Sequence, residues 1–364
     1  LANKIDNYLI RWRFQRNSEH KDTLAFAGYE KSTYLINMDF PRFGTGEGKA
    51  ALNQTVRGYD IYILCDVFNY GVTYKMYGIT VPMSPDEHFA NLKRAISAIE
   101  GKAKRVSVIM PMLYEGRQHK RSSRESLDCA MMLQELHNMG VENFITFDAH
   151  DPRVMNAIPL CGFESISPAY QMIKAAVNNV DNLKINKDNI MIISPDEGGM
   201  SRCIYYSTVL GVELGMFYKR RDFSRIVDGR NPIIAHEFLG DNVEGKDVII
   251  VDDMISSGES MIEVATKLKE LKAARIYIFS AFGLFCNGFD AFDKAFQEGI
   301  IDRVFTTNLI YGTPELLSKD WYIRVDMSKY LSYIIDTLNH DTSISDLLDP
   351  AEKINTLLEK KGLK

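Results

Sequence analysis

The segment VIIVDDMISSGES (residues 248–260) places two carboxylates, Asp252 and Asp253, between an apolar run and a hydroxyl-rich turn. A turn of Ser and Gly at the start of a helix exposes backbone N–H groups and hydroxyls to an anion such as a phosphate. Carboxylates accept hydrogen bonds from sugar hydroxyls, directly or through a divalent metal. Hydrogen-bond donors to phosphate beside acceptors for a diol are what a ribose 5-phosphate needs. We prefer this interpretation to the alternative that these residues only cap a strand and a helix. The turn consists of Ser256, Ser257, Gly258, Glu259 and Ser260.

Two basic blocks could serve the same phosphate chemistry. Residues 116–121 (GRQHKR) follow a predicted strand, and the tripeptide at residues 219–221 (KRR) follows GMFY. Phosphoryl-type transfer needs positioning, and it needs cations where negative charge spreads in the transition state. Taken alone, each block is most simply a solvated surface loop, since charge runs usually are.

Two shorter motifs end predicted strands. In Phe147-Asp148-Ala149-His150, the two-residue spacing predicts that Asp148 and His150 share one face of an extended chain. Residues 194–199 (SPDEGG) directly follow the apolar run 190–193. Alone, a histidine at a strand end is commonly structural, and Pro with paired Gly makes turns anywhere. Their places after strands favour functional loops.

The elements that position these motifs read as a parallel α/β architecture. Short apolar runs without alternation predict strands buried on both faces. A capping box at residues 84–87 (SPDE) predicts a helix start, and further helices are expected at about 126–139 and 259–271. Strand–helix–strand repetition implies a parallel sheet. The predicted strands are residues 61–64, 106–110, 144–147, 190–193, 248–251 and 276–279.

The strands cluster before about residue 150 and again after about residue 190. We therefore expect two domains, at residues 1–168 and 169–325. The remaining residues, 326–364, read as a helix and a tail that pack back on the first domain. The first 30 residues or so have no assignment.

Composition excludes several classes of protein. The chain has 364 residues, 25% charged and 46% hydrophobic, with 43 Lys+Arg against 48 Asp+Glu and a net charge of −5. These values are those of a globular protein and exclude a disordered, collagenous or coiled-coil chain. The mild acidity argues against a nucleic-acid partner, which would require a basic face.

The apolar runs and the cysteines of the sequence indicate where in the cell the protein is located. No apolar run approaches the roughly 20 residues that cross a bilayer, and the start has no apolar core of a signal peptide. Five cysteines without a CxxC pair predict buried free thiols in a reducing compartment. We therefore expect a cytoplasmic protein without a membrane partner.

Residues 248–260 resemble the phosphoribosyl-pyrophosphate binding motif shared by phosphoribosyltransferases and ribose-phosphate pyrophosphokinases. The other blocks resemble the pyrophosphokinases. Their Arg-Gln-Asp-Arg-Lys stretch implies that Arg117 and Gln118 hold ATP, although His119 replaces the Asp and Ser126 replaces a following Pro. Their Asp-Leu-His-Ala segment implies that His150 contacts ATP or metal.

The remaining blocks extend this resemblance. The family's Ser-Pro-Asp-x-Gly-Gly loop implies that Asp196 serves Mg²⁺. Its Lys-Arg-Arg opens a flexible catalytic loop, which implies that Lys219 and Arg221 stabilise the transferred group. Its Phe-x-Asp-Gly-Glu loop implies that Phe43 and Glu47 reach the adenine site of a neighbouring subunit, with Thr45 in place of the Asp.

The resemblance spans about residues 35–348. It implies two stacked phosphoribosyltransferase-like domains, each a mainly parallel sheet flanked by helices. It also implies transfer of pyrophosphate from ATP to the 1-hydroxyl of ribose 5-phosphate, giving phosphoribosyl pyrophosphate and AMP. Mg²⁺ is the implied cofactor, and the implied assembly is a homo-oligomer, a hexamer built from dimers.

Two alternatives stay open. The departures at Thr45, His119 and Ser126 allow a non-catalytic regulatory homologue that binds nucleotides. The motif at residues 248–260 also occurs in phosphoribosyltransferases. These enzymes consume phosphoribosyl pyrophosphate, and they lack the first domain, the Arg-Gln block and the Asp-x-His block.

Overall fold

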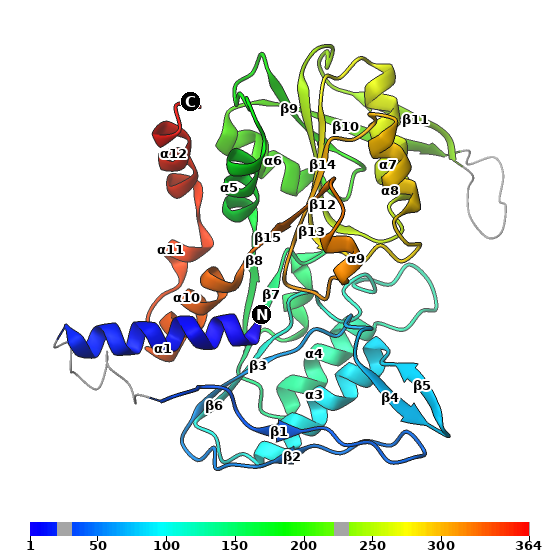
Figure 1. Ribbon diagram of the computed structural model, residues 1–364. Coiled ribbons are helices and arrows are strands. Elements are labelled where there is room, and N and C mark those ends of the chain that lie inside the picture. Colours follow the sequence, from blue (N-terminus) through cyan, green and yellow to red (C-terminus); the bar gives the residue numbers. More distant parts are fainter. Residues whose placement is uncertain (20–30, 222–232, 364) are drawn as a thin grey trace. The chain divides into compact units, whose positions relative to one another are not determined.

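The computed structural model describes residues 1–19, 31–221 and 233–363. Side chains at 17, 219–221 and 233–236 lie outside this description. The chain forms two compact units (Figure 1). Unit 1 comprises residues 1–167, 308–311 and 326–348, and unit 2 comprises residues 168–307, 312–325 and 349–364.

Unit 1 is built on a four-stranded parallel sheet with the order β3-β6-β7-β8. Its elements are α1 (Ala2–Ser18), β1 (Met38–Asp39), β2 (Ala51–Leu52), β3 (Asp60–Leu64), β4 (Thr73–Met76), β5 (Ile79–Pro82), α3 (Pro85–Ile99), β6 (Arg105–Ile109), α4 (Asp128–Asn138), β7 (Asn143–Phe147), the 3₁₀ helix η1 (Pro152–Ala157), β8 (Gly162–Ile166), α10 (Ser328–Asn339) and α11 (Ser345–Leu348). The apolar faces of α3 and α4 pack on this sheet and form its core.

The predicted capping box starts α3. Ser84 accepts a hydrogen bond from the backbone N–H of Glu87, and the Glu87 side chain accepts one from the N–H of Ser84. Two donors that a helix start leaves unpaired are thereby satisfied. The predicted start of this helix is confirmed. It could be predicted because residues within one helical turn form the whole capping box.

Within the unassigned N-terminal segment, Ala2–Ser18 forms α1, which packs on α10 (Figure 1). Asp336 of α10 pairs with Arg13 of α1 at 3.2 Å between Oδ1 and Nη2, and also with Arg16. The indole of Trp12 stacks on Tyr333 with ring centroids 4.5 Å apart. Helix α1 is therefore integrated into unit 1.

Unit 2 is built on a seven-stranded sheet with the order β11-β10-β9-β12-β13-β14-β15. Every pair is parallel except β10 and β11. Its elements are α5 (Ala169–Asn179), β9 (Ile190–Ser194), α6 (Met200–Leu210), β10 (Glu213–Arg221), β11 (Ile233–Leu239), β12 (Asp247–Ile255), α7 (Glu259–Glu270), β13 (Ile276–Gly283), α8 (Asp290–Gln297), β14 (Arg303–Thr307), α9 (Pro314–Leu317), β15 (Tyr322–Val325) and α12 (Ala351–Lys360). Figure 1 shows α5 and α6 on one side of this sheet and α7 and α8 on the other.

Strand β12 is longer than predicted. The sequence places Asp252 and Asp253 after a strand at residues 248–251, whereas β12 continues to Ile255. The reason is its ladder with β13, which still pairs Ile255 with Gly283. Both carboxylates therefore lie within the last four residues of a paired strand, where the backbone fixes their positions.

The C-terminal segment differs from the expectation that residues 326–364 pack on the first domain. Residues 326–348 belong to unit 1, but residues 349–364 belong to unit 2, where α12 contacts α5 and α6. The buried residues of α12 are Ile354 and Leu358, so its apolar face covers those helices.

Within the described residues, no helix is both long and apolar enough to cross a membrane.

The five cysteines are all free, as predicted, but they are not all buried. Cys129 and Cys203 are buried, Cys65 and Cys161 are half-buried, and Cys286 is exposed. The prediction of burial is wrong for Cys286, because it lies in the turn after β13 instead of in the strand.

Candidate active site

The sheet of unit 2 contains a point at which the connections from two paired, neighbouring strands run to opposite sides. Strand β9 connects through α6 to β10 on one side, whereas its neighbour β12 connects through α7 to β13 on the other side. Ligands of open α/β sheets bind at such a switch point, outside the carboxyl ends of the strands. The loop at 194–199 and the turn at 256–258 both leave the sheet here, so the fold brings these two predicted motifs together.

The turn at 256–258 leads into α7 and is held by the segment that follows β13. Cys286 donates its backbone N–H to the carbonyl of Ser256 at 2.8 Å, and Leu284 donates to the carbonyl of Ile255 at 2.9 Å. Gly258 caps α7 with a left-handed φ of +90°. A glycine cap has no side chain to cover the first N–H groups of the helix, which favours an anion there.

Asp252 and Asp253 share a cation that the sequence analysis did not identify. Arg202 of α6 places Nη1 3.6 Å from Oδ1 of Asp252 and Nη2 4.0 Å from Oδ1 of Asp253. Burial and the neighbouring charge of Asp253 raise the pKa of Asp252 well above its usual range, and Arg202 opposes this rise. One sequence signal could have indicated Arg202: a cation in the first turn of a helix opposes the helix dipole.

Asp196 is held in a tight turn between β9 and α6. Its Oδ1 accepts hydrogen bonds from the N–H groups of Gly198 and Gly199, at 2.9 and 3.2 Å. The hydroxyl of Ser194 donates to the carbonyl of Asp196 at 2.7 Å. The turn fixes one carboxylate oxygen, and within the described residues no hydrogen bond reaches Oδ2.

Lys219 and Arg221 belong to a strand that continues past the switch point. Strand β10 pairs with β9 only as far as Met216, and beyond this residue it pairs with β11 alone. The backbone of Lys219 and Arg221 therefore lies beyond the carboxyl end of β9, on the same edge of the sheet as residues 194–199. Their side chains, and residues 222–232 of the expected flexible loop, lie outside the described part of the chain.

The ATP-related motifs meet at the carboxyl edge of the sheet in unit 1. The rings of His119 and His150, which follow the neighbouring strands β6 and β7, have centroids 5.4 Å apart. Nε2 of His119 also lies 3.5 Å from Oδ2 of Asp151. Hydrogen bonds from Arg153 lower the pKa of Asp151 to about 2.

The predicted geometry of Asp148 is wrong. Strand β7 ends at Phe147, and Asp148 has a left-handed φ of +41°. The chain is not extended at this residue, so the two-residue alternation of a strand does not relate Asp148 to His150. His150 is exposed beyond the strand end.

The other predicted ATP contacts are surface groups of unit 1. Arg117 is exposed, whereas the side-chain amide of Gln118 donates to the carbonyl of Ser126 at 2.9 Å. Phe43 and Glu47 lie on an exposed turn that is closed by a hydrogen bond from the N–H of Phe43 to the carbonyl of Glu47, at 2.8 Å. These side chains remain accessible to a ligand.

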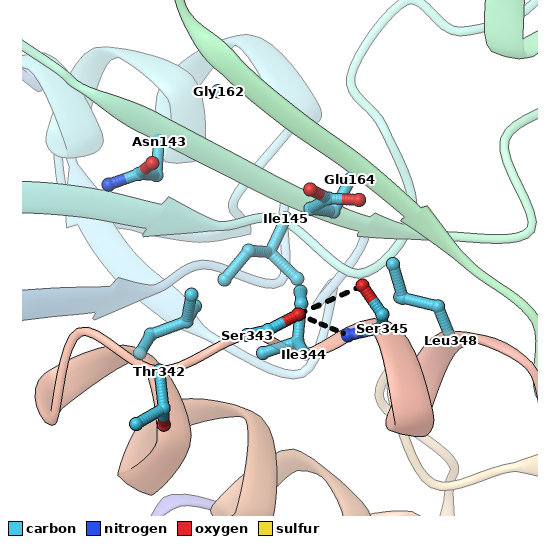
Figure 2. A pocket seen from close by; sticks show the side chains of 10 residues that line it. Asn143, Ile145, Gly162, Glu164, Thr342, Ser343, Ile344, Ser345 and Leu348 are labelled. Carbon is cyan, nitrogen blue, oxygen red and sulfur yellow. Dashed lines mark hydrogen bonds between the residues drawn. The ribbon is translucent and has the colours of Figure 1, made fainter.

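A cavity of about 270 Å³ lies elsewhere in unit 1 (Figure 2). Its walls include Asn143 and Gly162, which begin β7 and β8, and the loop at 342–344. The motifs at 117–119 and 148–150 follow the carboxyl ends of β6 and β7. The cavity therefore lies at the opposite edge of the sheet, and it contains no predicted site residue.

Comparison with known families accounts for nearly the whole chain. A sequence model of the N-terminal domain of ribose phosphate pyrophosphokinase matches residues 1–140. A phosphoribosyl transferase domain model matches residues 163–283, and a phosphoribosyl synthetase-associated domain model matches residues 225–349.

Individual relatives agree. Ribose-phosphate pyrophosphokinase of Vibrio parahaemolyticus is 26% identical over 313 residues, which are 85% of this chain and 90% of that protein. The Shewanella oneidensis protein of the same name is 27% identical over 307 residues, 84% of this chain and 88% of that protein. The crystal structure of phosphoribosylpyrophosphate synthetase from Mycobacterium smegmatis shares the fold, with a TM-score of 0.70, 19% identity and coverage of 84% of this chain and 91% of that one. The three domain models, together with relatives matched over most of their length, show that the chain belongs to the ribose-phosphate pyrophosphokinase family.

Proposed function

We propose that this protein is a ribose-phosphate diphosphokinase. The 1-hydroxyl oxygen of ribose 5-phosphate attacks the β-phosphorus of ATP, and the bond from this phosphorus to the α–β bridging oxygen breaks. AMP leaves with the bridging oxygen, the hydroxyl proton passes to solvent, and phosphoribosyl pyrophosphate forms. The relatives bear this activity in their names.

One structural observation carries the proposal. The switch point between β9 and β12 unites a helix start that suits a phosphate, a carboxylate pair that suits a diol, and the turn of Asp196. Ribose 5-phosphate presents a phosphate and a diol on one small molecule. We assign the phosphate to residues 256–260 and the hydroxyls to Asp252 and Asp253.

ATP is assigned to Arg117, Gln118 and His150, with Phe43 and Glu47 at its base. Lys219 and Arg221 are assigned to the transferred group, because cations lower the barrier to phosphoryl-type transfer by stabilising spreading negative charge. An Ala at either position is expected to lower kcat far more than it raises KM. Unchanged turnover in both variants would remove these residues from the mechanism.

Mg²⁺ fits this donor set as a companion of ATP. The described residues contain no cluster of three or more His, Cys, Asp or Glu that could hold a metal ion. However, Mg²⁺ in phosphate-transfer sites needs only one or two protein carboxylates besides the substrate phosphates and water. Asp196 would supply such an oxygen, and His150 is the second candidate. When bound, Mg²⁺ would neutralise phosphate charge during the transfer.

The decisive experiment measures which nucleotide product is released. Purified protein with ATP, Mg²⁺ and ribose 5-phosphate is expected to release AMP, and ³¹P NMR should show a pyrophosphate on the 1-carbon of the sugar. Omitting ribose 5-phosphate or adding EDTA should stop the release. Release of ADP instead would indicate an ordinary kinase, and no nucleotide product would indicate a non-catalytic homologue.

A homo-oligomer in the cytoplasm is also proposed for this enzyme, on the resemblance to its family. Sedimentation equilibrium of the purified protein tests the assembly. A particle of one chain's mass, 41.4 kDa, would contradict it.

A further inference from the structure

Two adjacent carboxylates at the end of β12 create an electrostatic problem. The side chain of Asp253 is 5% exposed and that of Asp252 is 19% exposed, so neither charge is fully hydrated. Like charges in such a place favour protonation of one group or displacement of a side chain. A diol site needs both groups ionised and fixed, because an ionised carboxylate offers only acceptors to the sugar hydroxyls.

Arg202 is placed to resolve this problem. Its side chain is only 11% exposed, and its two terminal nitrogens face one carboxylate each, at 3.6 and 4.0 Å. These separations exceed the roughly 2.7–2.9 Å of a charge-assisted hydrogen bond. The guanidinium therefore offsets both charges from a distance at which a sugar hydroxyl can approach Asp252 more closely than Arg202 does.

The position of Arg202 in the chain adds a second link. It lies in the first turn of α6, three residues after Gly199, which ends the turn that holds Asp196. A cation in this first turn is unfavourable for the helix itself, because the helix N-terminus carries partial positive charge. Its place therefore points to a partner outside the helix, and the carboxylate pair is such a partner.

We infer that Arg202 is a positioning residue for ribose 5-phosphate. It offsets the negative charges of Asp252 and Asp253, which favours their ionised forms, and it ties this pair to the loop of Asp196. This inference rests on the proposed function, since it takes the diol of ribose 5-phosphate as the ligand of the pair. It assigns Arg202 no contact with the reacting atoms.

The first test measures binding rather than turnover. Isothermal titration calorimetry with ribose 5-phosphate, Mg²⁺ and α,β-methylene-ATP avoids reaction, because this analogue has no α–β bridging oxygen to release. Arg202→Met is expected to raise the Kd for ribose 5-phosphate by about tenfold or more, a loss of about 1.4 kcal/mol. The Kd for the ATP analogue should stay within about twofold.

The matched control is Ser201→Met. Ser201 is the preceding residue on the same helix turn and is exposed, so it tests the effect of a methionine at this place without loss of the cation. It is expected to bind ribose 5-phosphate like the wild type. An equal loss in Ser201→Met would assign the effect to disturbance of α6 and overturn the inference.

A double-mutant cycle tests whether Arg202 acts through the carboxylates. In an Asp252→Asn background, Arg202→Met should weaken ribose 5-phosphate binding much less than in the wild-type background. Equal losses in both backgrounds would show that Arg202 contacts the ligand directly and would overturn the positioning role.

Arg202→Lys keeps the inference testable should Arg202→Met fail to fold. Lysine keeps the charge but not the planar fork that faces two carboxylates at once. We expect an intermediate loss, about threefold, that disappears in the Asp252→Asn background. Wild-type affinity in Arg202→Lys and no coupling to Asp252 would refute the inference. A wild-type protein that binds no ribose 5-phosphate would instead refute the proposed function.

Discussion

The ring of Phe292 occupies the space that a side chain at Gly258 would need. A β-carbon built on Gly258 would lie 2.5 Å from Cζ of Phe292, which is far inside van der Waals contact. Phe292 is fully buried and stacks on Trp321 with ring centroids 5.2 Å apart. Trp321 is fixed in turn by a 2.7 Å hydrogen bond from Nε1 to Oδ1 of Asp293. The proposed phosphate-binding turn therefore packs directly on a buried aromatic cluster whose rings are held in place.

Gly258→Ala is expected to destabilise unit 2 and to weaken ribose 5-phosphate binding. Two separate costs apply. The left-handed φ of +90° costs a non-glycine residue about 1–2 kcal/mol, and the contact with Phe292 adds about 1–3 kcal/mol of overpacking. Urea unfolding measures the stability, and calorimetry with ribose 5-phosphate measures the binding.

Gly245→Ala separates these two costs. Gly245 also has a positive φ, +74°, but a β-carbon there meets no atom within 4 Å. It should show the backbone cost alone and keep ribose 5-phosphate binding. Phe292→Leu should partly restore Gly258→Ala, since it removes the ring. Equal effects of the two glycine substitutions would contradict the role of Phe292.

Most of the fold can be predicted from the sequence, because short segments of sequence determine where most helices and strands begin. The start of α3 follows from a capping box that the next turn completes, and β9 follows from an apolar run whose residues are all buried. The end of β12 was misplaced because the pairing of Ile255 with Gly283 depends on a strand that begins 21 residues later (276 − 255 = 21). Local sequence carries no information about how far such a ladder continues.

The sequence predicts site residues only where they belong to a recognisable motif directly after a predicted strand. Asp196 and Gly258 are recognisable because tight turns require their residue types. Arg202 was missed because nothing beside it in sequence explains it, and its partners are some 50 residues away (252 − 202 = 50). The geometry of Asp148 differs from the prediction because the sequence signal for a left-handed φ is weak: Asp is enriched in this conformation, but few non-glycine residues adopt it.

Asp336→Ala is expected to cost unit 1 about 3–5 kcal/mol of unfolding free energy. The change leaves Arg13, whose side chain is 7% exposed, without its carboxylate partner in the contact between α1 and α10. Removing one partner of a buried ion pair is far more costly than removing an exposed one. Chemical denaturation monitored by circular dichroism measures the loss.

Lys4→Met is the matched control for this prediction. The pair of Lys4 with Asp326 also involves α1, but the two side chains are 61% and 50% exposed. Exposed pairs contribute about 0–1 kcal/mol, so the control should be nearly neutral. Similar losses of unfolding free energy in both variants would show that the burial of Arg13 does not make its ion pair more important for stability.

Asp66 is expected to make stability depend on pH between about 4 and 6. Burial raises the pKa of its carboxyl from 3.8 to about 6, although the backbone N–H groups of Tyr311 and Phe68 donate to it. The folded state therefore binds this proton more tightly than the unfolded state. Its contribution to stability is fully present below pH 3.8 and is lost as the pH rises through 6, by at most about 3 kcal/mol.

Asp66→Asn removes this titration. As the pH rises from 4 to 7, the wild type should lose stability relative to Asp66→Asn, by at most about 3 kcal/mol. Thermal or urea unfolding across this range measures the difference. Asp188→Asn, at an exposed loop position, is the control for an Asp-to-Asn change outside the Asp66 site. A difference between wild type and Asp66→Asn that stays constant with pH would contradict the prediction.

Cys286 is expected to report on occupation of the phosphate turn. It is the exposed thiol of the five, its backbone N–H binds the carbonyl of Ser256, and its Sγ lies 4.0 Å from Oγ of Ser256. It should react first with N-ethylmaleimide, because the other thiols are buried or half-buried. Ribose 5-phosphate should slow this reaction, since a phosphate bound at residues 256–260 would cover the thiol.

Mass spectrometry of peptides after timed alkylation measures the rate at Cys286. Cys286→Ser should abolish the fast reaction and retain binding of ribose 5-phosphate, since serine keeps the backbone N–H that holds Ser256. Half-buried Cys161, in unit 1, is the internal reference, and its rate should not respond to the sugar phosphate. Protection of both thiols would indicate a general tightening of the chain, whereas protection of neither would place the phosphate away from this turn.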